Sequence, residues 1–303
     1  MTTRAPEHTS TTPFPWLPAA GFVLVWSSGY IAGPASVAAA EPFTVLGLRF
    51  ALATLLFLPV ARWFRGPLRI DRQALLRVCA VGVVMNGVQF GFMYLAFEAG
   101  LGATLAALLH SLSPVLTVVL AGLFLGERVG RRQVAGLAVG VAGVVLVLGP
   151  DVDEAGGLLG LSLGLLGMLS LSLGTMGQRW IPPRVDPWWS ATLQFAATTP
   201  VMVVLALTLE GTDAVRDPVV GALTIGFLAV INSIVGLVLL GAVVRRGGAG
   251  AGSSVFFLSP PVTAVMAWLV LGETLDLREL AGLVVAVSGV ALAVTGRAPR
   301  PAG

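Results

Sequence analysis

The chain has 303 residues, of which 56% are hydrophobic and 11% charged, and its 18 basic and 15 acidic side chains give a formal net charge of +3. A soluble domain carries roughly 25% charged residues because water must wet its surface. The composition therefore argues against a soluble enzyme, a nucleic-acid-binding protein and a disordered chain. The single cysteine, Cys79, excludes an internal disulfide framework.

Ten apolar runs recur along the chain, each about 17–25 residues long and able to cross ~30 Å of hydrocarbon as a helix. They cover residues 16–37, 42–62, 74–97, 102–125, 133–149, 157–177, 189–209, 219–240, 248–271 and 279–295. Lipid admits only helices or closed barrels, and the alternating ~10-residue strands of a barrel are missing from the sequence. We therefore expect an all-α integral membrane protein with ten transmembrane helices.

The arginines predict the orientation of these spans. If the N-terminus is cytoplasmic, 15 of the 18 arginines lie inside, only Arg216 and Arg278 lie outside, and Arg49 lies within a span. This asymmetry follows the positive-inside rule, so the tails at residues 1–15 and 297–303 should both be cytoplasmic in the cell membrane. The alternative is a signal peptide cleaved near residues 36–40, although the first apolar run is longer than a usual signal core.

Short sequences recur at a nearly fixed offset, which indicates an internal repeat. Leu112-Ser113-Pro114 recurs as Leu258-Ser259-Pro260, and Leu125-Gly126-Glu127 recurs as Leu271-Gly272-Glu273, both 146 positions later. Asn86 corresponds in the same way to Asn232, whereas Arg49 corresponds to Gln194 at an offset of 145. Five spans in each repeat, residues 16–150 and 151–296, predict two halves of opposite orientation in the membrane, a plan used by secondary transporters.

The sequence resembles the ten-helix EamA-type family of the drug/metabolite transporter superfamily. The resemblance rests on Trp26-Ser27-Ser28-Gly29-Tyr30, on Arg49-Phe50, and on the repeated Leu-Ser-Pro and Leu-Gly-Glu sequences, and it extends over residues 16–295. It implies export or exchange of small metabolites, often amino acids, without identifying the substrate.

Polar side chains at membrane depth are costly and so mark candidate site residues. Asn86 and Asn232 lie roughly 18–20 Å into their spans, near the midplane, and Gln89 partly shares the face of Asn86. These amides are expected either to bind substrate or to form hydrogen bonds between helices.

Two ionisable side chains and one polar cluster complete the expected site. Arg49 is expected either to bind an anionic group of the substrate or to pair structurally with Glu41 or Glu98. His110 is either a proton relay or a neutral imidazole bonded to a neighbouring helix. The first span adds Trp26, Ser27, Ser28 and Tyr30.

Proline predicts matching breaks in the fourth and ninth spans, because it has no N–H to donate. Ser113 and Pro114 in one half, and Ser259 and Pro260 in the other, are candidate hinges or fixed bends. Glu127 and Glu273 lie at helix ends, where capping is expected, and the Gly136–Gly140 spacing is a helix-packing motif.

The sequence favours a secondary transporter that exports or exchanges an amino acid or related compound by alternating access. Its expected partners are a small-molecule substrate and the lipid bilayer, with no nucleic acid, cofactor or metal, and the oligomeric state, monomer or homodimer, is open. One alternative is an uncoupled facilitator or exchanger for sugar-phosphates or nucleotide-sugars. Another is an intramembrane serine hydrolase built on Gly160-Leu161-Ser162-Leu163-Gly164 with His110, and a structural scaffold is the third. We expect no enzyme, since the serine motif lies inside a predicted helix.

Overall fold

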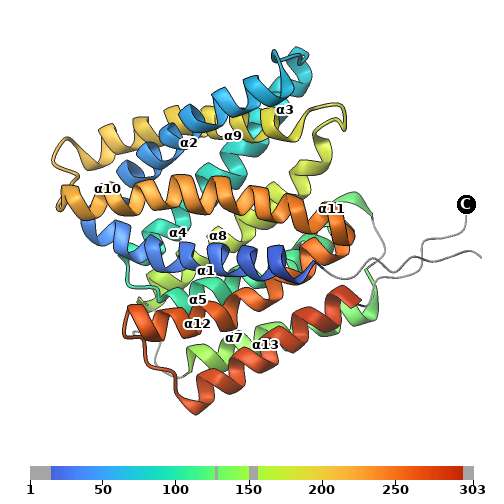
Figure 1. The fold of residues 1–303 in the computed structure, drawn as a ribbon. Helices are drawn as coiled ribbons and strands as arrows, with labels where there is room; N and C mark the ends of the chain where they lie inside the picture. The colour runs from blue at the N-terminus through green and yellow to red at the C-terminus, as the bar shows by residue number, and fades with distance from the viewer. Residues whose placement is uncertain (1–14, 127–128, 150–155, 296–303) are drawn as a thin grey trace, which may run out of the picture.

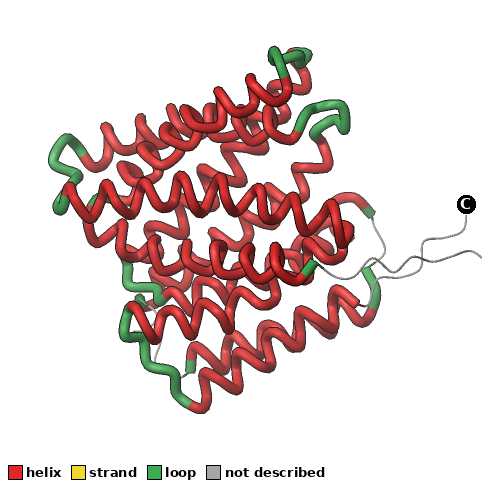
Figure 2. The backbone as a smooth tube through the Cα atoms, viewed as in Figure 1, coloured by secondary structure: helices red, strands yellow, loops and turns green. Residues whose placement is uncertain are grey.

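The computed structural model describes residues 15–126, 129–149 and 156–295, and over these ranges the chain forms helices and no strand (Figures 1 and 2). The first part of the chain contains α1 (Trp16–Ala39), α2 (Pro42–Arg65), α3 (Arg72–Gly82), the π-helical η1 (Val83–Val88), α4 (Gln89–Glu98), α5 (Ala103–Ser111), α6 (Ser113–Leu125) and α7 (Arg131–Leu148). The second part contains α8 (Gly157–Gly177), η3 (Gln178–Trp180), α9 (Pro187–Leu205), the π-helical η4 (Ala206–Glu210), α10 (Pro218–Phe227), the π-helical η5 (Leu228–Val235), α11 (Gly236–Ser254), η6 (Val255–Leu258), α12 (Ser259–Val270) and α13 (Leu277–Thr295).

Two of the expected spans are divided at the prolines. Helix α5 ends at Ser111 and α6 begins at Ser113, directly before Pro114. In the second part, the 3-10 turn η6 leads into α12, whose second residue is Pro260. The expected start of the ninth span at residue 248 is wrong, because α11 continues as a helix to Ser254.

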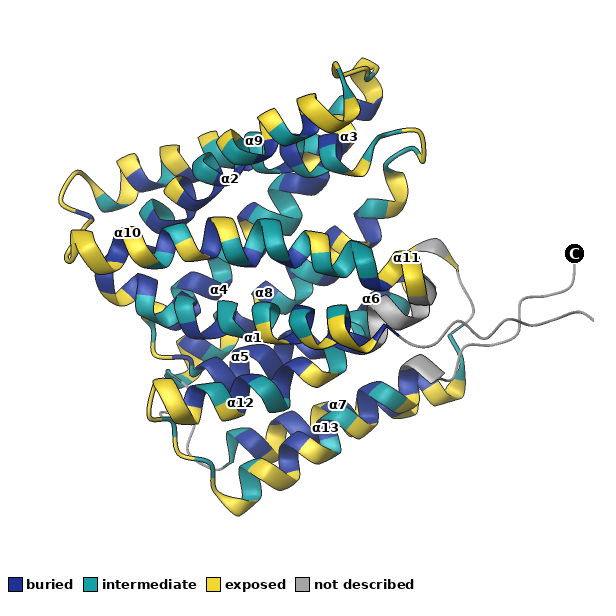
Figure 3. Ribbon diagram, viewed as in Figure 1, coloured by how far each residue is buried: buried dark blue, intermediate teal, exposed yellow. Residues whose placement is uncertain are grey.

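Eight helical segments within the described ranges are long and apolar enough to cross a membrane. Large apolar side chains cover much of the outer surface, including Leu55, Leu158 and Leu223, which are 67%, 76% and 68% exposed. Figure 3 shows such exposed residues along the outward faces of the helices and buried residues between them. Exposed apolar surface of this extent needs a lipid partner, so the chain is a multi-pass membrane protein.

The helices pack so that segments distant in sequence lie side by side. Helix α2 runs along α9 and α7 runs along α13, and Figure 1 shows these two pairs on opposite sides of the bundle. Between them lie α1, α4, α5, α8 and α12. A continuous apolar core runs through the bundle and includes Phe50 of α2, Tyr94 of α4, Leu108 of α5 and Leu228 of η5. The core therefore joins residues from both parts of the chain.

Two carboxylates from the second part of the chain cap helices of the first part. The first N–H groups of a helix lack partners within the helix, and the residues that precede α2 and α5 supply no side-chain cap. The Glu210 carboxylate accepts hydrogen bonds from the Phe43 and Thr44 N–H groups at 2.6 and 2.8 Å. The Glu273 carboxylate accepts from the Ala103 N–H at 2.7 Å and from the Thr104 hydroxyl at 2.7 Å. The capping role expected of Glu273 is therefore present, whereas Glu127 lies outside the described residues.

Candidate functional site

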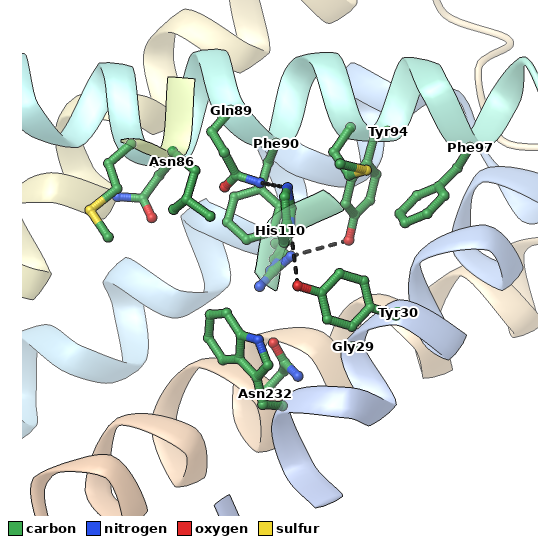
Figure 4. Close-up of a pocket in the computed structure, with 14 residues that line it drawn as sticks. Gly29, Tyr30, Asn86, Gln89, Phe90, Tyr94, Phe97, His110 and Asn232 are labelled. Carbon is green, nitrogen blue, oxygen red and sulfur yellow. Dashed lines mark hydrogen bonds between the residues drawn. The ribbon is translucent and has the colours of Figure 1, made fainter. Parts of the chain in front are cut away.

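A cavity of about 90 Å³ lies inside the helix bundle. One water needs about 10–15 Å³ by this measure, so the space holds several waters or a small solute. Its walls come from α1, α2, η1, α4, α5, α8 and η5, and Figure 4 shows the lining side chains around it. The fourteen lining residues are Trp26, Gly29, Tyr30, Arg49, Met85, Asn86, Gln89, Phe90, Met93, Tyr94, Phe97, His110, Leu171 and Asn232.

Seven of the nine side chains that the sequence suggests for a site lie around this cavity. They are Trp26, Tyr30, Arg49, Asn86, Gln89, His110 and Asn232. The other two, Ser27 and Ser28, do not line it. The Ser27 hydroxyl contacts Ser259, 3.3 Å from the carbonyl oxygen and 3.2 Å from the hydroxyl oxygen. The Ser28 hydroxyl donates within its own helix to the Val25 carbonyl at 2.7 Å.

Arg49 is a buried cation at the cavity wall. The residue is 4% exposed, and no ion pair of the described residues includes it. Its Nη1 donates to the Tyr94 hydroxyl at 3.1 Å, and the guanidinium carbon lies 4.6 Å from the centre of the Phe90 ring, a cation–π distance. Its Nε is buried without a hydrogen-bond partner. A buried charge normally requires a counter-charge.

The two carboxylates considered as partners of Arg49 lie elsewhere. Glu41 forms an ion pair with Arg216, and a Glu98 carboxylate oxygen lies 3.8 Å from Nη2 of the same arginine. The Arg216 side chain also donates to the Val37 carbonyl at 2.8 Å. These contacts tie the loop before α10 to the first two helices, and they leave Arg49 with an aromatic and hydroxyl environment.

His110 bridges two helices with both nitrogens of its ring. Its Nδ1 lies 2.9 Å from the Tyr30 hydroxyl, and its Nε2 lies 3.2 Å from the side-chain amide nitrogen of Gln89 (Figure 4). With the Gln89 amide as donor, Nε2 accepts and Nδ1 carries the proton toward Tyr30. No hydrogen bond of the described residues joins Ser162, which is exposed, to His110, which is buried.

Asn86 and Asn232 lie in matching π-helical turns. Asn86 is in η1 and Asn232 is in η5, and both side chains reach the cavity. The Asn232 amide nitrogen donates to the Val25 carbonyl at 2.7 Å, whereas the Asn86 side-chain amide makes no hydrogen bond to any of the described residues. π-Helical turns are rare and concentrate at functional sites because they re-aim side chains.

The serines beside the proline breaks contact the opposite half of the chain. Ser172 in α8 donates to the Ser113 carbonyl at 3.2 Å, as Ser27 in α1 does to the Ser259 carbonyl at 3.3 Å. Ser172 stands 145 positions after Ser27, the repeat offset. The candidate hinges are therefore held by two equivalent bonds. The repeat offset was the signal by which sequence reasoning could have found Ser172.

Sequence reasoning also missed the aromatic wall of the cavity. Phe90, Tyr94 and Phe97 line it, together with Met85 and Met93. Starting from Asn86, Phe90, Met93 and Phe97 follow at spacings of four, three and four residues, which places them on one helix face. The cavity wall therefore combines one cation, several amides and a broad aromatic surface.

The fold and this interior cavity define a membrane protein of the solute-transporter type, and comparison with known proteins identifies the family. The EamA-like transporter family matches residues 16–149 and 158–295, so the chain belongs to that family. The resemblance seen in the sequence is thus confirmed.

Named relatives match almost the whole chain. A probable amino-acid metabolite efflux pump of Salmonella typhimurium is 26% identical over 90% of this chain and 92% of its own length. An uncharacterized inner membrane transporter of Escherichia coli, YedA, is 25% identical over 92% and 90% of the two chains. A probable terminal-alkyne amino-acid exporter of Streptantibioticus cattleyicolor is 27% identical over 89% and 90%.

One similar fold is known from a crystal structure of a protein that shares 19% sequence identity. That structure superposes with a TM-score of 0.65 and covers 91% of this chain and 95% of its own. At this level of identity the likeness establishes the fold alone.

Proposed function

We propose that this protein is a secondary transporter that exports or exchanges a small metabolite, an amino acid or a related compound, by alternating access across the cytoplasmic membrane. The observation that carries the proposal is the interior cavity, where the buried cation Arg49, which has no counter-ion among the described residues, lines solute-sized space. Intramembrane charges of this kind mark substrate pathways. The names of the Salmonella and Streptantibioticus relatives support amino acids or their derivatives as the substrate class.

The proposed architecture is ten transmembrane helices in two inverted repeats, residues 16–150 and 151–296. Equivalent contacts across the repeat support it. A methyl group added at Gly289 would lie 2.7 Å from the Gly136 carbonyl oxygen, and one added at Gly282 would lie 2.8 Å from that of Gly143. Gly136 and Gly282 occupy equivalent positions in the two repeats, as do Gly143 and Gly289. Gly136 on α7 therefore lies against Gly289 on α13, and Gly143 lies against Gly282, so the two contacts are related by the repeat.

In this architecture the two terminal tails, residues 1–15 and 297–303, are cytoplasmic, as the arginine distribution predicts. The substrate would contact Trp26, Tyr30, Arg49, Asn86, Gln89, His110 and Asn232. The breaks at Pro114 and Pro260 would allow the two halves to rock about this site. The hydrogen bonds that Ser172 and Ser27 donate to the Ser113 and Ser259 carbonyls would then either change partners or move together with the two breaks.

Uptake into proteoliposomes tests the proposal. Purified protein would be reconstituted and tested for flux of labelled amino acids, sugars and cationic dyes, with and without a pH gradient. Arg49→Ala and Asn86→Ala should reduce flux strongly, whereas Leu55→Ala, on the lipid-facing side of the same helix as Arg49, should not. Normal flux in both cavity variants would refute the site assignment. Flux that ignores the pH gradient would favour the uncoupled facilitator.

A further inference from the structure

We propose that the cavity selects its ligand through one carboxylate bound to Arg49, and that a small apolar monoanion binds better than a zwitterion or a cation. Such ligands are carboxylic acids whose amino group is absent or masked, for example 2-oxo or N-acyl acids. The inference rests on the proposed function, because it names the substrate class of the same site.

The free edge of the Arg49 guanidinium has the geometry for a carboxylate. Nη1 is engaged by the Tyr94 hydroxyl, and the Phe90 ring lies against the guanidinium carbon. Among the described residues, Nε and Nη2 have no hydrogen-bond partner. These two nitrogens form one edge of the planar group, and a carboxylate binds such an edge through two parallel hydrogen bonds.

The charge balance of the cavity favours a monoanion. None of its fourteen described lining residues is acidic, so Arg49 is not neutralised from the wall. A carboxylate without an ammonium group would cancel the charge, whereas a zwitterion would leave one positive charge in an apolar interior. A phosphate ester carries about two charges and would leave a negative excess, and a cationic ligand would add to the repulsion.

The remaining walls fit an apolar body with one further polar group. Trp26, Phe90, Tyr94 and Phe97 present aromatic surface to the cavity. The Asn86 side-chain amide makes no hydrogen bond to any of the described residues, and it offers both a donor and an acceptor. The carbonyl oxygen of a 2-oxo or N-acyl group could accept a hydrogen bond from the Asn86 side-chain N–H. The aromatic surface matches an alkyl or aryl side chain.

Ligand binding to the purified wild-type protein in detergent tests the proposal with matched probes. Three side-chain sizes would be used, those of alanine, leucine and phenylalanine. For each side chain, the 2-oxo acid is the anion, the amino acid is the zwitterion and the amino-acid amide is the cation. The thermal shift should give the tightest binding for the 2-oxo acid, and binding about thirtyfold weaker or more for the amide, since the amide leaves a buried charge unpaired.

A variant separates a ligand-binding arginine from a structural one. Arg49→Gln should abolish the preference for the anion while leaving the melting temperature of the ligand-free protein equal or higher, because it removes an uncompensated buried charge. A structural arginine would instead lower that temperature. Arg49→Lys keeps the charge but loses the planar edge, and it should weaken anion binding while retaining the order of the three charge types.

The outcomes distinguish this inference from the proposed function. Equal binding of amide and 2-oxo acid, or no shift with any probe at millimolar concentration, would overturn the inference. Binding of the 2-oxo acid that depends on Arg49, with no flux of any solute in proteoliposomes, would leave the inference standing and refute transport.

Discussion

The contact between α7 and α13 gives the sharpest prediction about stability. In the structure a methyl group added at Gly143 would lie 2.4 Å from the backbone nitrogen of Ala286 and 2.6 Å from its Cα. Carbon atoms in ordinary contact are about 3.5–4.0 Å apart, so Gly143→Ala must separate the two helices by about 1 Å. Overpacking of this kind costs about 1–3 kcal/mol. We expect the melting temperature of the detergent-purified protein to fall by about 2–4 °C for each kcal/mol.

Gly226→Ala is the matched control for this experiment. Gly226 lies inside α10, and outside its own stretch of helix no atom of the described residues lies within 4 Å of the methyl group that the substitution adds. Alanine favours a helix interior over glycine by about 0.5–1 kcal/mol, so this variant should be as stable as the wild type or more stable. Equal melting temperatures for Gly143→Ala and Gly226→Ala would refute the close approach of α7 and α13.

Three other predictions concern single contacts. Glu210→Gln should lower the free energy of unfolding by about 1–3 kcal/mol, measured by denaturant titration in detergent, because a charged cap of α2 is lost; an unchanged value would contradict the cap. Gly29→Ala should reduce flux in a protein that still folds, because the added methyl would lie 2.6 Å from the Asn232 amide nitrogen; full flux would contradict this contact. The hydrogen bond from Arg184 holds the pKa of Asp71 at about 2, below its ordinary 3.8. The contribution of this carboxylate to stability is therefore present above pH 3.8 and lost as the pH falls toward 2. An NMR titration of the Asp71 carboxyl group should show its pKa rising in Arg184→Ala.

Much of the fold could be predicted because the bilayer imposes simple rules on the sequence. The apolar runs predicted helix positions closely, as for α1, α2 and α8. The start of the ninth span was missed because residues 247–254 are all glycine, alanine or serine, and nothing in their composition marks the continuation of α11. Proline was informative at Pro114 and Pro260, where the expected spans are divided. A missing N–H does not always end a helix, since Pro34, Pro59 and Pro200 lie inside α1, α2 and α9.

The candidate site was predicted in part because polar residues are rare at membrane depth. Arg49, Asn86 and His110 could be identified from the free-energy cost of placing a polar or charged side chain in the membrane. The π-helical turns around Asn86 and Asn232 could not be predicted, because one extra residue per turn leaves no mark on composition. The capping of α2 by Glu210 was also invisible, since it joins residues 166 and 167 positions apart.

Thiol accessibility tests the central claim, a solute-binding chamber reached from both sides of the membrane. Cys79 is the only cysteine, so Met85→Cys, at the cavity wall, would be made in a Cys79→Ser background and reconstituted in oriented vesicles. A membrane-impermeant thiol reagent should modify the cysteine from either side, and a small apolar carboxylic acid should slow the reaction, while a lipid-facing Leu55→Cys stays unreactive. If Met85→Cys reacts from neither side, or reacts equally fast with and without the acid, the chamber does not bind and pass a solute.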